Sequence, residues 1–314
     1  MPFLEKVTWN DLMNVKMIFL SIIIEALPFI LVGVFISALI NQLVSEQLIA
    51  RLLPKNKLYS ILPACFIGVL FPVCDCGIVP IARRLIKKGV PLPAAVAFML
   101  TAPIVNPVVA SATSFAFNSP AIMWLRLGMA LLVAICTALC LGNIFRSPEL
   151  RSQAALQDYE HPCGCNHGAD CQSSWYNRCL NVLSDSCNEF FEMGRYLIFG
   201  ALLSSIAQTF IPHTIMTSVG QDPTLSIAVM MVFAFFVSIC STSDAFIAAS
   251  FSGSFTIASL LSFMTFGPMI DLKNTFMLCH TFRPRLVLTL VLLTSLLCFI
   301  SAYLLHILLQ GVLL

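Results

Sequence analysis

Long apolar runs separated by short polar stretches dominate the chain. There are eight of these segments, at roughly residues 14–43, 59–82, 91–117, 120–145, 190–217, 224–250, 255–279 and 284–309. A helix needs about 20 predominantly apolar residues to cross a bilayer, and each segment offers at least that length. The pattern therefore predicts an all-α polytopic membrane protein of about eight transmembrane helices, with the lipid bilayer as its main partner.

Composition supports this class and excludes others. Hydrophobic residues make up 59% of the chain and charged residues 10%, whereas about a quarter of a soluble chain is charged. The net charge of +2 comes from short scattered clusters, so no nucleic-acid partner is expected. The first apolar run, Met17 to Ile40, is too long for the hydrophobic part of a signal peptide and predicts a retained first span.

A polar stretch divides the chain into two similar halves. We expect a first membrane repeat at 1–145, a polar His/Cys-rich linker at 146–189 and a second repeat at 190–314. When the sequence is shifted by about 165 residues, chemically distinctive residues align in order. The aligned pairs include Glu25 with Glu192, Gly33 with Gly200, Ser37 with Ser204, Cys74 with Cys240, Pro103 with Pro268, and Asn106 with Asp271.

Each half holds four apolar segments, and two arrangements follow from that number. If every segment crosses the bilayer, the halves are parallel repeats. If one segment per half is re-entrant, the number of crossings is odd and the repeats are inverted.

If the chain crosses the bilayer eight times, the positive-inside rule gives a modest preference for one orientation. A cytoplasmic N-terminus would place nine basic residues inside and six, Lys273 among them, outside. We therefore expect the N-terminus and the linker to be cytoplasmic.

The stretch "FPVCDCGIVP" at 71–80 combines two thiols, a carboxylate and three helix breakers. On a regular helix, residues two apart point about 200° away from each other, so Cys74 and Cys76 could not bind one ion together. Proline and glycine unwind helices, and unwound backbone in a membrane is tolerated where it lines a cavity. We therefore predict a metal and transport site at Cys74, Asp75 and Cys76. The alternative is a kinked helix with two packing cysteines.

Three further stretches resemble this broken-helix pattern. "SICSTSDAF" aligns with the first motif and offers Cys240 and Asp244, while its hydroxyls can also bond to helix carbonyls. "TAPIVNP" and "GPMID" place a proline three residues before Asn106 and Asp271, respectively. Such breaks expose half-helix ends and free carbonyls, which build midplane transport sites. For Asn106 the alternative is a hydrogen bond that ties neighbouring helices together.

Two acidic residues occupy aligned positions in the first span of each half. Glu25 lies inside an apolar run, where a bare charge is costly, so we expect Glu25 or Asp75 to carry protons. The alternative is an ion pair, which for Glu192 would use Arg195 on the same helix.

The linker contains "HPCGCNHGADC". Thiolates combined with imidazoles select zinc, copper(I) and similar ions. We predict a metal-acquiring loop, with a redox-active or incidental cysteine loop as the alternative. Its five candidate ligands are His161, Cys163, Cys165, His167 and Cys171.

The block "CDCGIVPIARRLIKKGVPLPAAVAFMLTAPIVNP" resembles the bacterial predicted-permease family that includes the ArsP organoarsenical exporters. The signature is C-x-C-G-x-x-P at Cys74, Cys76, Gly77 and Pro80. The linker is similar to a branch described as copper/zinc efflux transporters. The resemblance implies an inner-membrane permease of about eight spans that exports thiophilic metal or metalloid species. The second half lacks one motif cysteine, which argues against a symmetric thiol cage.

Together these features predict a secondary transporter of the bacterial inner membrane. Its site would combine Cys74, Asp75 and Cys76 with Cys240, Asp244, Asn106 and Asp271. The chain has no nucleotide-binding P-loop, so coupling to protons is expected. We expect no resident cofactor, a transported or loop-bound copper or zinc ion, and a cytoplasmic metal donor as a partner.

Two alternatives stay open. The substrate could be a trivalent organoarsenical, or the chain could be a membrane thiol-redox protein. An enzyme is not expected, because neither H-E-x-x-H nor G-x-S-x-G occurs.

Overall fold

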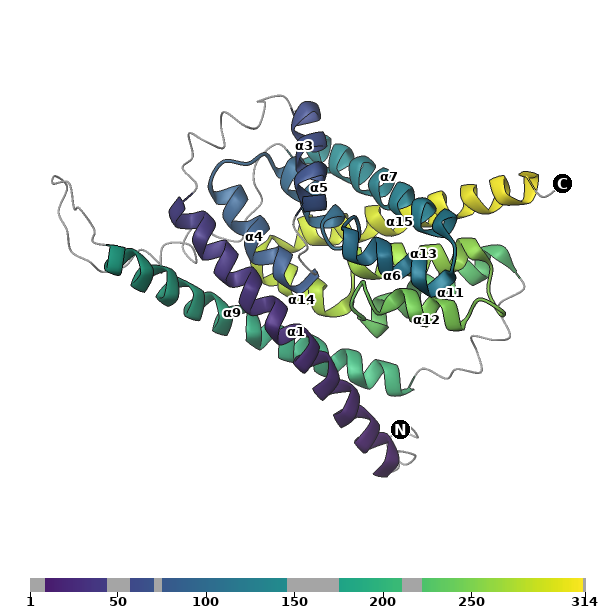
Figure 1. The fold of residues 1–314 in the computed structure, drawn as a ribbon, viewed down its shortest axis with the longest axis horizontal. Helices are drawn as coiled ribbons and strands as arrows, with labels where there is room; N and C mark the ends of the chain where they lie inside the picture. Colours follow the sequence, from purple (N-terminus) through teal and green to yellow (C-terminus); the bar gives the residue numbers. More distant parts are fainter. Residues whose placement is uncertain (1–8, 44–56, 71–74, 146–174, 211–221, 313–314) are drawn as a thin grey trace.

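A computed structural model describes residues 9–43, 57–70, 75–145, 175–210 and 222–312, and its regular structure there is helical (Figure 1). The all-α prediction is confirmed. Four helices are long and apolar enough to cross a membrane. These are α1 (Trp9–Leu43), α7 (Pro120–Ile144), α9 (Trp175–Phe210) and α15 (Pro284–Val312).

The other four predicted segments are each divided into two helices. The pairs are α3 (Lys57–Leu70) with α4 (Asp75–Lys87), α5 (Leu92–Thr101) with α6 (Pro107–Phe117), α11 (Pro223–Val237) with α12 (Asp244–Ser250), and α13 (Ile257–Met269) with α14 (Leu272–Thr281). The same order, one long helix, two divided segments and another long helix, therefore occurs on both sides of the linker.

The α5–α6 segment runs the full length of α7 in the opposite direction. The start of α5 meets the end of α7, because a Cβ built at Gly142 would lie 2.5 Å from Pro93 Cγ. The end of α6 meets the start of α7, where Arg126 donates to Thr113 Oγ1 at 2.7 Å. The α13–α14 segment also packs along α15, where Cys298 Sγ donates to Ser262 O at 3.9 Å. Together the two half-helices reach far enough to cross a bilayer.

The α3–α4 segment turns back instead. The last turn of α3 meets the last turn of α5, since a Cβ at Gly68 would lie 2.8 Å from Thr101 Oγ1, and α3 packs along α5. Helix α4 leads into α5 through a tight turn at Gly89, which has a positive φ of 90° that suits glycine. Helices α3 and α4 therefore enter and leave at the same end of the molecule, as a re-entrant pair.

The α11–α12 segment also turns back. Phe233 of α11 stacks on Phe263 of α13 with centroids 5.7 Å apart, and Phe251, just after α12, meets Phe233 edge-on at 6.3 Å. A continuing helix would have carried Phe251 away from Phe233. Of the eight predicted segments, six therefore run the length of the body and two are re-entrant.

Helices α1 and α9 cross one another on one side of the body (Figure 1). Helix α1 is parallel to α4, because Gly33 meets Gly77 and Ser37 meets Pro80. The contact is close: a Cβ at Gly33 would lie 2.5 Å from Gly77 Cα, so only glycine fits there. The aligned Gly200 of α9 is similarly close to α14, because a Cβ built at Gly200 would lie 2.7 Å from Lys273 Cα.

These directions define two ends of the molecule. Helices α1, α4 and α7 end at what we call the linker end, where α9 and α15 begin. Helix α1 begins at the opposite end, which we call the terminal end, and there α9 and α15 finish. The N-terminal end of α1 and the helix ends that flank the linker are thus on opposite sides, contrary to the expectation that the N-terminus and linker share one side.

The core lies between these helices. Every residue of α5 is buried, as is nearly all of α13, which suits two helices that are apolar on all faces. The outer helices expose large apolar side chains, among them Phe35, Leu292 and Leu308, as expected for surfaces that face lipid.

Candidate functional site

Four half-helices begin near the middle of the molecule, each with a polar side chain at its first turn. Asp75 and Asp244 are the first residues of α4 and α12. Asn106 and Asp271 are the N-caps of α6 and α14, where their Oδ1 atoms accept from Val109 N at 2.9 Å and Asn274 N at 2.6 Å. Such oxygens satisfy free N–H groups and the positive end of the helix. All four residues are buried.

Lys273 joins the two halves at this level. Its Nζ lies 3.0 Å from Asp75 Oδ2 and 3.1 Å from Asp271 Oδ2, and it donates to Ser238 O at 3.0 Å. We call Lys273, Asp75 and Asp271 the Lys273 triad. All three side chains are at most 4% exposed. Ser238 ends α11 in the left-handed region, so the ammonium also meets the negative end of a half-helix.

A small cavity adjoins the triad. Its volume of about 10 Å³ has room for roughly one water molecule. Cys76 and Cys240 both line it, one from each half, and Thr242 Oγ1 contacts Cys240 Sγ at 3.7 Å. The complete lining is Ile22, Glu25, Ala26, Phe29, Asp75, Cys76, Ser238, Cys240 and Lys273. Two thiols and carboxylates from both halves thus meet beside one buried cation.

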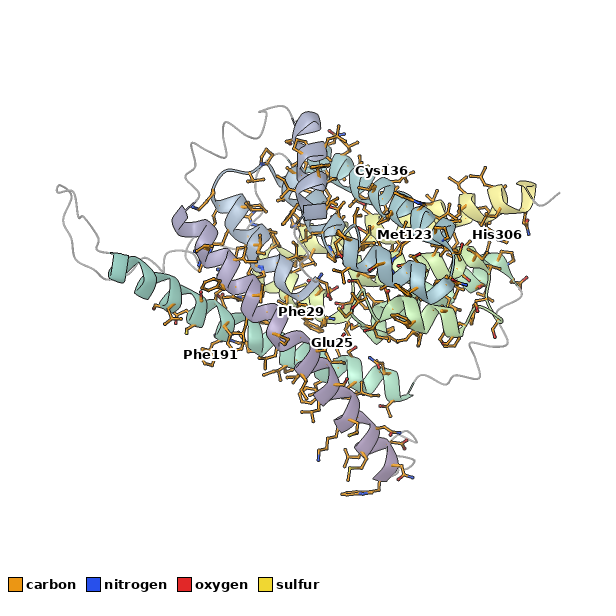
Figure 2. All side chains as sticks on the ribbon, in the orientation of Figure 1. Glu25, Phe29, Met123, Cys136, Phe191 and His306 are labelled. Atoms are coloured by element: carbon orange, nitrogen blue, oxygen red, sulfur yellow. The ribbon has the colours of Figure 1, made fainter. Side chains whose placement is uncertain are left out.

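Glu25 lies on the rim of this cavity, on the exposed side of α1 near its crossing with α9 (Figure 2). Its Oε1 accepts from Ser243 Oγ at 3.5 Å. Residues 22–29 belong to the part of α1 on the terminal-end side of Gly33. The cavity therefore extends from the triad toward the terminal end.

Arg126 forms a second buried cluster. It pairs with Asp244 Oδ2 at 2.7 Å and is 1% exposed. It also donates to Thr113 Oγ1, Ser241 O and Met264 O. A planar guanidinium with four partners connects α6, α7, α12 and α13, and one carboxylate balances its charge.

A third set of charges lies on the linker-end side of the triad. Arg83 pairs with Glu192 at 3.2 Å and Arg84 with Glu189 at 3.4 Å. His280 Nε2 lies 2.6 Å from Glu192 Oε1. We call these the linker-end ion pairs. They connect α4, α9 and α14, and Ser37 of α1 joins them through Glu189 at 3.0 Å.

The structure brings part of the predicted site together. Asp75, Cys76 and Cys240 share the small cavity, and Asp271 reaches it through Lys273. Asp244 instead pairs with Arg126. Asn106 bonds within its own segment, to Ala102 O and Pro103 O and as the cap of α6.

Other predicted ligands lie outside the described residues. These are Cys74 and the linker residues His161, Cys163, Cys165, His167 and Cys171. Among the described residues, no three His, Cys, Asp or Glu side chains come close enough to hold a metal ion.

The sequence analysis missed the two central cations. Lys273 was counted as a loop charge, but it is 3% exposed. Its position two residues after Asp271, inside an apolar run, was the available signal, and Arg126 lies inside the run 120–145 in the same way. The expected partner of Glu192 was also wrong, because Arg83 and His280 take the place of Arg195.

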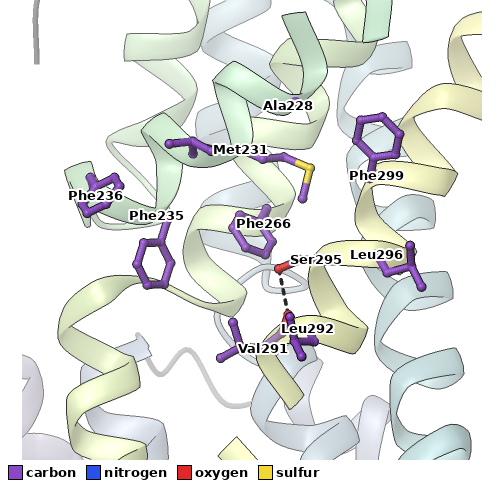
Figure 3. A pocket seen from close by; sticks show the side chains of 11 residues that line it. Ala228, Met231, Phe235, Phe236, Phe266, Val291, Leu292, Ser295, Leu296 and Phe299 are labelled. Atoms are coloured by element: carbon purple, nitrogen blue, oxygen red, sulfur yellow. Dashed lines mark hydrogen bonds between the residues drawn. The ribbon is translucent and has the colours of Figure 1, made fainter. Parts of the chain in front are cut away.

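An apolar pocket of about 660 Å³ lies between α11, α13 and α15 (Figure 3). Phe235, Phe266 and Phe299 are among its aromatic lining residues. Ser295 is its polar side chain, and its hydroxyl already donates to Val291 O at 2.7 Å. This pocket offers no convergent charged ligands and is separate from the triad.

Comparison with known proteins gives consistent matches. A family model described as a predicted permease, ArsP_1, matches residues 11–307. The UPF0718 protein YcgR of Bacillus subtilis is 41% identical over 90% of this chain and 93% of its own length. A putative two-component membrane permease complex subunit of Streptococcus mutans is 40% identical over 89% of this chain and 90% of its own. No solved structure matches.

Proposed function

Because the chain belongs to the ArsP_1 predicted-permease family, we propose that it is a secondary transporter of the bacterial inner membrane that exports a thiophilic metal ion such as copper or zinc. Its membrane character and permease family are the premises. The substrate, direction and coupling are the proposal.

One observation carries the proposal. Cys76 from the first half and Cys240 from the second line the same buried cavity, beside the carboxylates of the Lys273 triad. Soft thiolates select copper(I) and zinc. Carboxylates would complete the donor set once an ion draws these side chains closer than they lie in this conformation. Sites between two halves, built from the ends of broken helices, are typical of secondary transporters.

The helix directions support inverted repeats. Each half would contribute three crossings and one re-entrant pair, so the second half would be turned over relative to the first. Helices α6 and α14, whose N-caps are Asn106 and Asp271, would then run away from the middle of the molecule in opposite directions. This favours the second of the two arrangements that the sequence left open.

Basic residues favour a cytoplasmic linker end. Among the described residues, most of the Lys and Arg lie at helix ends there, whereas the part of α1 near the terminal end carries Lys16. We therefore keep the cytoplasmic linker as the proposal, with the start of α1 on the opposite side. The described basic residues at the linker end are Lys57, Arg83, Arg84, Lys87, Lys88, Arg178, Arg283 and Arg285.

Export then follows a simple route. The linker ligands would collect the ion in the cytoplasm and pass it to Cys76 and Cys240 by ligand exchange. The linker-end ion pairs close the cytoplasmic side in this conformation, and the cavity extends toward Glu25 on the outer side. Glu25 is the proposed proton carrier, because Asp75 is already paired with Lys273.

Transport in inside-out vesicles tests this function. The wild-type protein should accumulate zinc or copper(I) when a proton gradient is imposed, and Cys76→Ser and Cys240→Ser should each reduce the rate at least tenfold. Cys298→Ser is the matched control, since Cys298 is a fully buried thiol that contacts Ser262 O in the core. Unchanged rates in the first two variants would contradict the site.

The surroundings of the two thiols keep the organoarsenical alternative open. Cys76 and Cys240 pack in one cluster with the apolar Ala26, Ile30 and Val34, which would suit a methylated arsenic(III) species. Competition of methylarsenite with zinc in the same vesicles decides between the substrates. A thiol-redox protein would instead interconvert Cys76 and Cys240 between thiol and disulfide without net transport.

A further inference from the structure

We propose that the Lys273 ammonium is a tethered cation that occupies the substrate's position in the empty transporter, and that an incoming metal cation displaces it from Asp75 and Asp271. This inference rests on the proposed function. It assigns a role in substrate specificity to Lys273, a residue that the sequence motifs did not reveal.

The position of the ammonium is the first argument. Nζ lies 3.0 and 3.1 Å from oxygens of two carboxylates that come from different halves. A metal cation that joined the two halves would use the same oxygens. Lys273 also lines the cavity that Cys76 and Cys240 line, so the ammonium lies beside the same cavity as the two thiols.

Charge is the second argument. In their ionised forms, Asp75 and Asp271 carry two negative charges and Lys273 one positive charge, so the triad keeps one negative charge in a buried position. Uncompensated buried charge is costly. A divalent cation that replaced the ammonium would balance both carboxylates, which gives the triad a preference for divalent over monovalent cations.

The contrast with Arg126 is the third argument. Arg126 balances one carboxylate, has four partners and lines neither the cavity beside the triad nor the apolar pocket. Its planar group suits a permanent joint. Lys273 is a compact charge on a flexible four-carbon stem, which can leave its partners without moving the helix that carries it.

Thermal unfolding with and without zinc tests the displacement. All proteins would be full length, with the five linker ligands replaced so that zinc reports on the centre. Lys273→Met should unfold at a lower temperature than its parent without zinc, because two buried carboxylates lose their partner. Zinc should then raise its unfolding temperature more than that of the parent, since binding stabilises the folded state. Titration with zinc should show that Lys273→Met binds zinc about tenfold more tightly than its parent does.

Two variants complete the test. Arg126→Met is the matched control, and it should lose stability without gaining response to zinc. If Lys273→Met does not fold, Lys273→Gln removes the charge but keeps a hydrogen-bond donor for both carboxylates, and zinc should stabilise it more than the parent.

Each outcome decides a different point. An equal or smaller zinc response in Lys273→Met, while the parent responds, would overturn the displacement and leave the transporter proposal standing. If neither protein responded to zinc or copper(I), the central site itself and the displacement would both fail.

Discussion

Arg126 of the first half and Asp244 of the second form a buried ion pair, with 2.7 Å between Nη2 and Oδ2. The pair connects a long helix to the start of a re-entrant half-helix. It therefore fixes the two halves relative to each other on the terminal-end side, as the Lys273 triad does at the centre.

Removing one partner of this pair should be costly. Arg126→Met leaves Asp244 charged and buried, so we expect a loss of about 3–5 kcal/mol of stability. The thermal unfolding midpoint in detergent measures the effect. The double variant Arg126→Met with Asp244→Leu should recover much of the loss. A single variant as stable as the wild type would contradict the described pairing.

The contact between α1 and α4 should tolerate no side chain. A Cβ at Gly33 would lie 2.5 Å from Gly77 Cα. Gly33→Leu must therefore push α1 and α4 apart, so expression of folded protein should fall severely. Gly128→Leu is the matched control, because a Cβ at Gly128 has no neighbour within 4 Å. Monodisperse yield on size exclusion compares the two. Equal yields would show that α1 does not pack there.

The linker-end ion pairs should control access to the centre from the cytoplasmic side. Glu192→Gln removes the charge that holds Arg83 and His280. We expect Cys76 to react several-fold faster with a thiol reagent applied to inside-out vesicles. Glu25→Gln, at the aligned position on the other side, should leave this rate unchanged. An unaltered rate in Glu192→Gln would mean that these pairs do not close the path.

Orientation can be tested at two exposed basic positions. Lys16→Cys lies on α1 toward the terminal end, and Arg285→Cys lies at the start of α15 at the linker end. In intact cells freed of the outer membrane, an impermeant thiol reagent should label the first and reach the second only after permeabilisation. Labelling of both or of Arg285→Cys alone would contradict a cytoplasmic linker end.

The sequence was informative where local chemistry determines structure. All eight apolar segments appear as helices, and the α5–α6 break falls at Pro103 and Asn106 as predicted. Other predicted breakers are accommodated within helices instead, since Gly77 and Pro80 lie inside α4 and Pro268 lies inside α13. Asn106 and Asp271 were aligned from sequence, and both prove to be N-caps. These effects span only a few residues.

What could not be predicted depends on contacts between distant residues. Whether a segment crosses or turns back is decided by packing such as that of Phe251 on Phe233, and a run of apolar residues fits both. The pairing of Lys273 with Asp75 spans almost two hundred residues. Asp244 was expected at the shared site because it supplies a carboxylate in the segment that aligns with the first motif. The structure pairs it with Arg126, which is too distant in sequence to suggest itself as the partner.

The central claim is that thiols from both halves bind one ion beside the triad. X-ray absorption of the zinc-loaded protein, with the cysteines of residues 160–188 replaced by serine, tests it most directly. The account predicts sulfur ligands at about 2.3 Å that come from Cys76 and Cys240 and disappear in the Cys76→Ser, Cys240→Ser double variant. An unchanged sulfur signal in that variant, or a zinc shell of oxygen and nitrogen alone in its parent, would contradict the account.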